Sequence, residues 1–126
     1  MILLDTHAAL WLLAAPERLG DQARQDISTS EVCYFSAVSI AECSIKRMIG
    51  RLDVPAELDR ILAEQGLQPL PLRPEHAAAL ERFPELSRHD PFDRLLLAQA
   101  LVERCRFLTA DERLLALGID WIAPAR

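Results

Sequence analysis

Four acidic residues come from four separate predicted elements and sit at positions that favour ligand chemistry: Asp5, Glu42, Asp93 and Asp111. Carboxylate oxygens are the ligands that Mg²⁺ and Mn²⁺ prefer, and the pattern shows no matching buried Lys or Arg that would neutralise these acids. A divalent metal in such a site lowers the pKa of a bound water, polarises a phosphoryl oxygen and orients an in-line attack. The four acids therefore predict metal-dependent chemistry at phosphorus.

Glu42 lies on an apolar face of a helix that we predict from Ser36, its N-cap, to Ile49. Positions 38, 42, 45 and 49 share this face and read Val, Glu, Ile, Ile. A glutamate with apolar neighbours one turn away on both sides is rare unless it is paired or binds a metal. The alternative is a place at the edge of the helix, where Glu42 reaches solvent.

Asp93 continues the apolar seam of a helix predicted over residues 91–104. Positions 93, 97, 100 and 101 read Asp, Leu, Ala, Leu, and the partial positive charge of a helix N-terminus eases but does not neutralise a carboxylate there. Asp90 fits the N-cap and Pro91 the first helical position. Capping is our preferred interpretation for Asp90 and an incomplete one for Asp93.

Asp5 and Asp111 each follow a predicted strand, and the carboxyl ends of parallel strands are where open α/β sheets bind ligands. Taken alone, either acid could simply cap the following helix. The predicted strands cover residues 1–5, 32–35 and 106–110, with 119–123 closing the sheet and 67–72 as an extended connector or edge strand. The predicted helices cover residues 7–14 (capped by Thr6), 21–29, 36–49, 55–66, 74–82, 91–104 and 111–117. This alternation predicts one α/β domain over 1–126, with a mostly parallel sheet of four or five strands flanked by helices.

The composition is that of an ordinary soluble globule: 126 residues, 51% apolar and 26% charged. The net charge of -5 argues against a simple electrostatic clamp on nucleic acid but not against an enzyme that acts on it with a metal. No targeting peptide or membrane span is expected, which predicts a cytoplasmic protein. The three cysteines, Cys33, Cys43 and Cys105, are expected to be buried thiols.

Four segments in the expected order, "LLDTHAALW", "SAVSIAECSIKRMIGRL", "HDPFDRLLLAQA" and "FLTAD", resemble the PIN-domain ribonucleases. Within that family the chain is most similar to the VapC-type toxins of bacterial toxin–antitoxin pairs. The resemblance implies a PIN-like fold and a site made of Asp5, Glu42, Asp93 and Asp111. It further implies supporting hydroxyls at Thr6, Ser39 and Thr109, while Asp90 matches a recurrent acid of the subfamily.

The resemblance implies an endoribonuclease that uses Mg²⁺ or Mn²⁺ and leaves a 5′-phosphate and a 3′-hydroxyl. The apolar segments 8–15 and 55–66, together with the resemblance, suggest a homodimer and a cognate antitoxin lying in an apolar groove. Lys46 and Arg94 are the basic residues that we expect to contact RNA. His7 and His89 are interpreted as surface or packing residues.

Other functions remain to be weighed against this one. A non-catalytic PIN-like binding module is the main alternative, although all four acids are present. A phosphoacceptor receiver domain fits poorly because "LDTH" offers one acid where a pair is needed. His7 breaks the D-x-D motif of haloacid-dehalogenase-like phosphatases, and no nucleotide-cradle or G-x-S-x-G motif is present.

Overall fold

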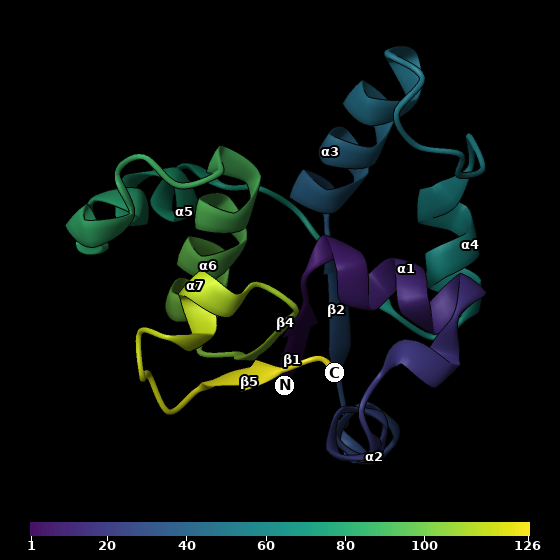
Figure 1. Cartoon of the computed structure of the whole chain (residues 1–126), viewed down its shortest axis with the longest axis horizontal. Helices are drawn as coiled ribbons and strands as arrows, with labels where there is room; N and C mark the ends of the chain where they lie inside the picture. Colours follow the sequence, from purple (N-terminus) through teal and green to yellow (C-terminus); the bar gives the residue numbers. More distant parts are fainter.

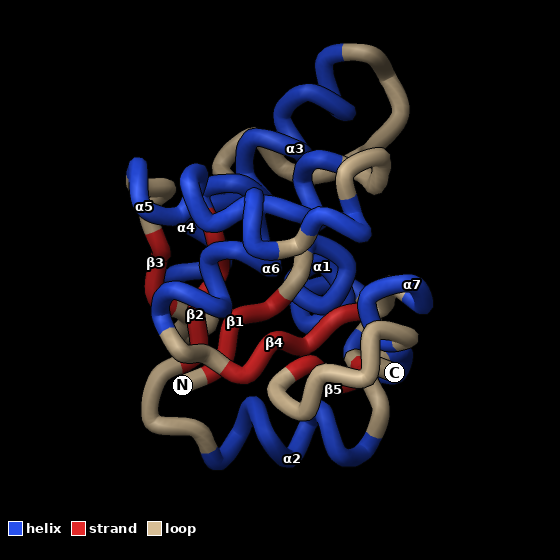
Figure 2. The backbone as a smooth tube through the Cα atoms, turned by 90° about the vertical axis from the view of Figure 1, so that its left-hand side faces the viewer, coloured by secondary structure: helices blue, strands red, loops and turns tan.

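The computed structural model describes residues 1–126 and contains five parallel strands in the order β3-β2-β1-β4-β5 (Figures 1 and 2). The strands are β1 (Ile2–Leu4), β2 (Cys33–Ser36), β3 (Gln68–Leu70), β4 (Arg106–Thr109) and β5 (Ile122–Pro124). The predicted α/β class is confirmed. Segment 67–72 supplies the edge strand β3, where Pro69 can do without a ladder hydrogen bond.

Helices cover both faces of the sheet. They are α1 (Thr6–Ala14), α2 (Asp21–Thr29), α3 (Ala37–Met48), α4 (Leu58–Glu64), α5 (Pro74–Ala78), α6 (Pro91–Glu103) and α7 (Glu112–Leu115). Figure 1 shows α5, α6 and α7 on one side of the sheet and α1 and α4 on the other. Short 3-10 helices cover Pro16–Arg18, Ala79–Arg82 and Pro84–Leu86.

Alternating side chains of the central strands build two cores. Ile2 and Leu4 pack with α1, α2 and α4, whereas Leu3 and Phe107 pack with α6 and α7. This follows from the two-residue period of a strand, which sends successive side chains to opposite faces. All three cysteines are buried and free, as predicted. No helix combines the length and the apolar character needed to cross a bilayer.

The strands are added on one side of β1 first and then on the other, so the strand order switches between β1 and β4. From β1 the chain proceeds to β2 and β3, whereas β4 leads to β5 on the other side. Open α/β sheets bind ligands in the crevice at such a switch point. The order also differs from the 2-1-3-4-5 order of receiver domains, so the receiver alternative is wrong.

Several predicted helix ends are confirmed and others are corrected. Asp90 caps α6 by accepting from the N–H groups of Phe92 (2.8 Å) and Asp93 (3.3 Å), as predicted. Thr6, however, is not the cap of α1; Asp5 is, because its carboxylate accepts from the Ala8 N–H at 2.7 Å.

Three predicted helices are shorter than the sequence suggested. The helix predicted over 55–66 begins at Leu58, three residues after Pro55, and ends at Glu64. The one predicted over 74–82 is α5 followed by a 3-10 helix, and the one over 111–117 is the four-residue α7 with Asp111 as its N-cap. Each of these helices has only one or two turns. Helices this short are not stable by intrinsic helix propensity alone, so tertiary packing sets where they end.

Candidate active site

Asp5, Asp93 and Asp111 line one cleft of about 220 Å³ beside the ends of β1 and β4. Asp5 follows β1, Asp111 follows β4, and Asp93 lies in the first turn of α6. The switch point between β1 and β4 therefore brings together three of the four acids predicted to form the site. Their place agrees with the rule for ligand sites in open parallel sheets.

Asp5 is a fixed carboxylate at the base of this cleft, with only 2% of its surface exposed. Its Oδ1 accepts from the Ala8 N–H at 2.7 Å, and its Oδ2 accepts from the Thr109 hydroxyl and the Ala110 N–H, both at 2.8 Å. Burial raises the pKa of Asp5, although these three hydrogen bonds act in the opposite direction. Thr109 also accepts from the Asp111 N–H at 3.0 Å, so its hydroxyl links two of the acids.

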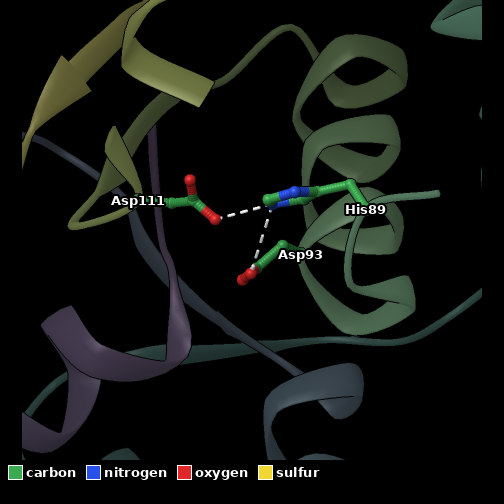
Figure 3. Close-up of side chains that lie close together, drawn as sticks. All are labelled: His89, Asp93 and Asp111. Carbon is green, nitrogen blue, oxygen red and sulfur yellow. Dashed lines mark hydrogen bonds and ion pairs between the residues drawn. The ribbon is translucent and has the colours of Figure 1, made fainter. Parts of the chain in front are cut away.

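His89 lies close to Asp93 and Asp111, as Figure 3 shows. Its Nε2 donates to Asp111 Oδ2 at 2.6 Å and lies 3.7 Å from Asp93 Oδ2. The other oxygen of Asp111 caps α7 by accepting from the Arg113 and Leu114 N–H groups. Potential ligand atoms of the three residues all lie within 4.8 Å of one another.

Asp93 and Asp111 differ in proton affinity. Burial, the adjacent Asp111 carboxylate and the charges of Asp90 and Asp5 raise the pKa of Asp93 to about 8. The pKa of Asp111 is lowered: burial acts to raise it, but the hydrogen bonds from His89 and the α7 backbone prevail. Without a cation, Asp111 carries the negative charge of the pair and Asp93 retains a proton over much of the neutral range.

Glu42 is buried in α3, but it is paired, contrary to the expectation that no basic side chain neutralises it. Its Oε2 lies 2.5 Å from Lys46 Nζ one turn further along, and its Oε1 accepts from the Thr6 hydroxyl at 2.7 Å. The hydroxyls of Thr6 and Ser39 are 2.9 Å apart. Lys46 reaches back along the helix and covers the carboxylate, which the apolar pattern of this face did not predict. Burial of Glu42 therefore needs no metal, and its role in the site remains a prediction.

The two basic residues predicted to contact RNA are both engaged elsewhere. The ion pair with Glu42 holds Lys46 and raises the pKa of its ammonium group. Arg94 turns its guanidinium to the Ser87 carbonyl at 3.3 Å and lines a different pocket, beside Phe83. Neither position supports the predicted RNA contact.

Sequence reasoning missed His89, which it interpreted as a surface or packing residue. The available signal was its spacing of four residues before Asp93, but α6 does not begin until Pro91. His89 therefore reaches Asp93 and Asp111 from the segment that precedes the helix. Two carboxylates with one imidazole form a donor set that suits Mn²⁺ well and Mg²⁺ through its oxygens. The residues present thus fit a divalent metal.

Comparisons with known proteins agree with this fold. Residues 2–119 match the PIN domain family, so the chain belongs to the PIN-domain family. Ribonuclease VapC22 of Mycobacterium tuberculosis is 30% identical over 115 residues, covering 90% of this chain and 88% of the relative.

Two solved structures share the fold over almost their whole length. A toxin–antitoxin complex from Klebsiella pneumoniae has a chain with a TM-score of 0.68 and 16% identity, covering 100% of this chain and 98% of its own. The second is VapBC2 from Rickettsia felis bound to a DNA fragment from its promoter. Its TM-score is 0.67 at 13% sequence identity, and the match covers 98% of this chain and 97% of the chain in that structure.

Proposed function

We propose that this chain is a metal-dependent endoribonuclease and the toxin of a toxin–antitoxin pair. The observation that carries the proposal is the grouping of Asp93, Asp111 and His89 with buried Asp5 at the switch point of a PIN-family sheet. The relative at 30% identity is named a ribonuclease, and a structural neighbour belongs to a toxin–antitoxin complex. Both names support the assignment.

Mg²⁺ or Mn²⁺, held by Asp5, Asp93 and Asp111 with Glu42 as a further predicted ligand, would lower the pKa of an attacking water and offset charge on the phosphoryl oxygens. The chain prepares the site in three ways. Thr109 and two backbone N–H groups immobilise Asp5. His89 fixes the orientation of Asp111 through its hydrogen bond to Oδ2. The first turn of α6 positions Asp93 in the same cleft, where it would become a charged ligand once a cation displaces its proton.

Water forms a new P–O bond while the P–O3′ bond breaks, and the departing 3′-oxygen takes up a proton. The products are a 5′-phosphate and a 3′-hydroxyl, and no 2′-hydroxyl is required. The experiment is cleavage of RNA by purified protein in Mn²⁺, Mg²⁺ and EDTA, followed on gels. Cleavage in metal that stops in EDTA separates the enzyme from the alternative of a non-catalytic PIN-like module.

The first prediction concerns the acids themselves. Asp93→Asn and Glu42→Gln should each lower the cleavage rate by a hundredfold or more, because each removes a charged ligand. The control is Glu31→Gln, which removes an exposed acid that does not line the cleft, and this variant should cleave RNA at the wild-type rate. Far-UV circular dichroism should be unchanged in all three. Wild-type cleavage rates in both acid variants would show that the site is misassigned.

The partners that we propose are RNA, a cognate antitoxin and a second copy of the chain. The predicted apolar segment 8–15 is largely packed into the core, since Ala8, Ala9 and Trp11 are buried. The end of α3 is more open, with Ile45 48%, Met48 86% and Ile49 61% exposed. A separate groove of about 610 Å³ lies at the start of α3, between Ala37 and Ile40 of that helix, α4 and β3. This apolar surface suits an amphipathic antitoxin segment.

A further inference from the structure

The wall of the cleft opposite the α6 and α7 acids is basic and aromatic. Arg18, Arg126, Trp11 and His7 line the same 220 Å³ cleft as the acids. The guanidinium carbon of Arg18 lies 4.7 Å from the centroid of the Trp11 ring, and that of Arg126 lies 5.3 Å from it. Trp11 is only 6% exposed, so the two arginines cover it and stand between the ring and solvent. Such stacking fixes a guanidinium plane while its N–H groups stay free to bind.

The backbone holds Arg126 at this wall. The Gly20 N–H donates to the Ala125 carbonyl at 2.9 Å, and the Ala125 N–H donates to the Thr109 carbonyl at 2.8 Å. A Cβ at Gly20 would lie 2.7 Å from the Arg126 carbonyl carbon, so the close approach requires glycine. Thr109 thus supports Asp5 through its hydroxyl and the segment carrying Arg126 through its carbonyl.

These arginines are the cations that the cleft leaves free. Neither forms an ion pair with a side-chain carboxylate, although lysine and arginine side chains form seven such pairs elsewhere in the protein. Lys46 is held by Glu42, and Arg94 faces Ser87. An RNA strand that approaches an acidic cleft on a protein of net charge -5 needs positive charge close to the scissile phosphate. Arg18 and Arg126 are the residues placed to supply it.

We propose that Arg18 and Arg126, stacked on Trp11, form a binding subsite for a backbone phosphate of the RNA strand next to the bond that is cut. This inference rests on the proposed ribonuclease function and names the residues that position its substrate. The subsite contacts a phosphate that does not react, so it acts on substrate binding and leaves the hydrolytic step to the acids. Because it reads the backbone, it contributes affinity without base preference.

The test is a double variant, Arg18→Gln/Arg126→Gln, compared with Arg24→Gln/Arg60→Gln. The control removes the same two charges from exposed ion pairs on α2 and α4. With a fluorescein-labelled single-stranded RNA in Mn²⁺, the cleft variant should show a KM raised roughly ten- to a hundredfold. Its kcat should stay within about threefold of wild type, because the lost contacts are made equally in ground and transition states.

Binding of the same RNA in EDTA, followed by fluorescence anisotropy, gives a readout that does not need cleavage. The slope of log affinity against log salt should fall in magnitude by about 0.7 in the cleft variant, the value expected for the loss of one phosphate contact on a single strand. Arg18→Lys/Arg126→Lys should bind with intermediate affinity, since it keeps the charge but loses the planar stacking.

Each outcome has a separate meaning. A cleft variant that matches the control in KM, anisotropy and salt slope overturns the subsite while leaving a ribonuclease in place. A wild type that cuts no RNA in either metal overturns the proposed function, and the anisotropy comparison then decides the subsite by itself. Wild-type protein that neither cuts nor binds RNA overturns both.

Discussion

At the scale of single residues, two neighbouring aspartates, Asp93 and Asp111, differ in proton affinity because their hydrogen-bond partners differ. His89 and the first turn of α7 stabilise the charged form of Asp111, while Asp93 has no comparable donor and lies among other acids. This asymmetry could not be predicted, because it depends on a histidine that reaches the cleft from outside the helix. The three acids of the cleft could be picked out from the sequence, since each interrupts an apolar pattern or follows a strand, whereas a place for Glu42 in the site stays a prediction. The partner of Glu42 was missed, because its face was judged by apolar neighbours alone.

The raised pKa of Asp93 makes a stability prediction. The folded protein retains a proton that the unfolded chain loses near the ordinary value of 3.8, so metal-free stability should fall as pH rises from about 4 to about 8. Asp93→Asn removes this repulsion. In EDTA at pH 8 it should melt above wild type, by roughly 4 °C for each 1 kcal/mol gained. Mn²⁺ should stabilise wild type, because it binds only the folded site, and should stabilise the variant much less.

Thermal melts of both proteins from pH 5 to 8, in EDTA and in Mn²⁺, make the comparison. Glu31→Gln again serves as the control and should follow wild type. A variant less stable than wild type in EDTA at pH 8, with an unchanged response to Mn²⁺, would mean that Asp93 only supports the helix.

At the scale of elements, the N-terminus of α6 is the part on which the site depends most. Asp90 caps it, Pro91 begins it and Asp93 projects from its first turn. These features were predictable because N-cap, proline and apolar seam all agree on where the helix begins. The ends of α4, α5 and α7 were not, since those helices are short and are set by packing on the sheet. The N-cap of α1 was misplaced by one residue, because Asp5 and Thr6 both suit that role.

Asp90→Ala should therefore loosen the first turn of α6. Loss of the two hydrogen bonds to the Phe92 and Asp93 N–H groups should lower the free energy of unfolding by about 1 kcal/mol. Asp90→Asn keeps a capping acceptor and should stay within about 0.5 kcal/mol of wild type. Urea denaturation followed by circular dichroism measures both. Equal stability of Asp90→Ala and wild type would show that the cap contributes nothing.

At the scale of the whole molecule, the strand order explains why Asp5 and Asp111 meet, because it makes β1 and β4 neighbours at the switch point of the sheet. The parallel sheet was predictable from the alternation of strands and helices. The order β3-β2-β1-β4-β5 was not, because sequence periodicity does not say which strands are neighbours. The basic wall of Arg18 and Arg126 was hidden for the same reason: its two arginines meet only through tertiary structure.

The exposed end of α3 makes a prediction about partners. Met48→Glu with Ile49→Glu should abolish binding of the proposed antitoxin, because two charged side chains would replace apolar ones on this surface. Folding and RNA cleavage should be unchanged, since both side chains point into solvent. Gel filtration of co-expressed proteins measures the loss, with Arg47→Glu as a polar-to-polar control on the same helix. An intact complex in the double variant would place the partner elsewhere.

The hydrogen bond between Thr109 and Asp5 joins residues 104 positions apart in the chain. Asp5, which follows β1 in the middle of the sheet, is therefore fixed only after β4 has paired with β1. This pairing requires closure of the long chain segment between the two strands, which is entropically costly. During synthesis Asp5 precedes Thr109, Asp111 and β4, and it lacks these partners until they have been translated. An unfinished chain thus carries no assembled cleft, and the time needed for synthesis itself delays the appearance of a cutting protein inside the cell that makes it.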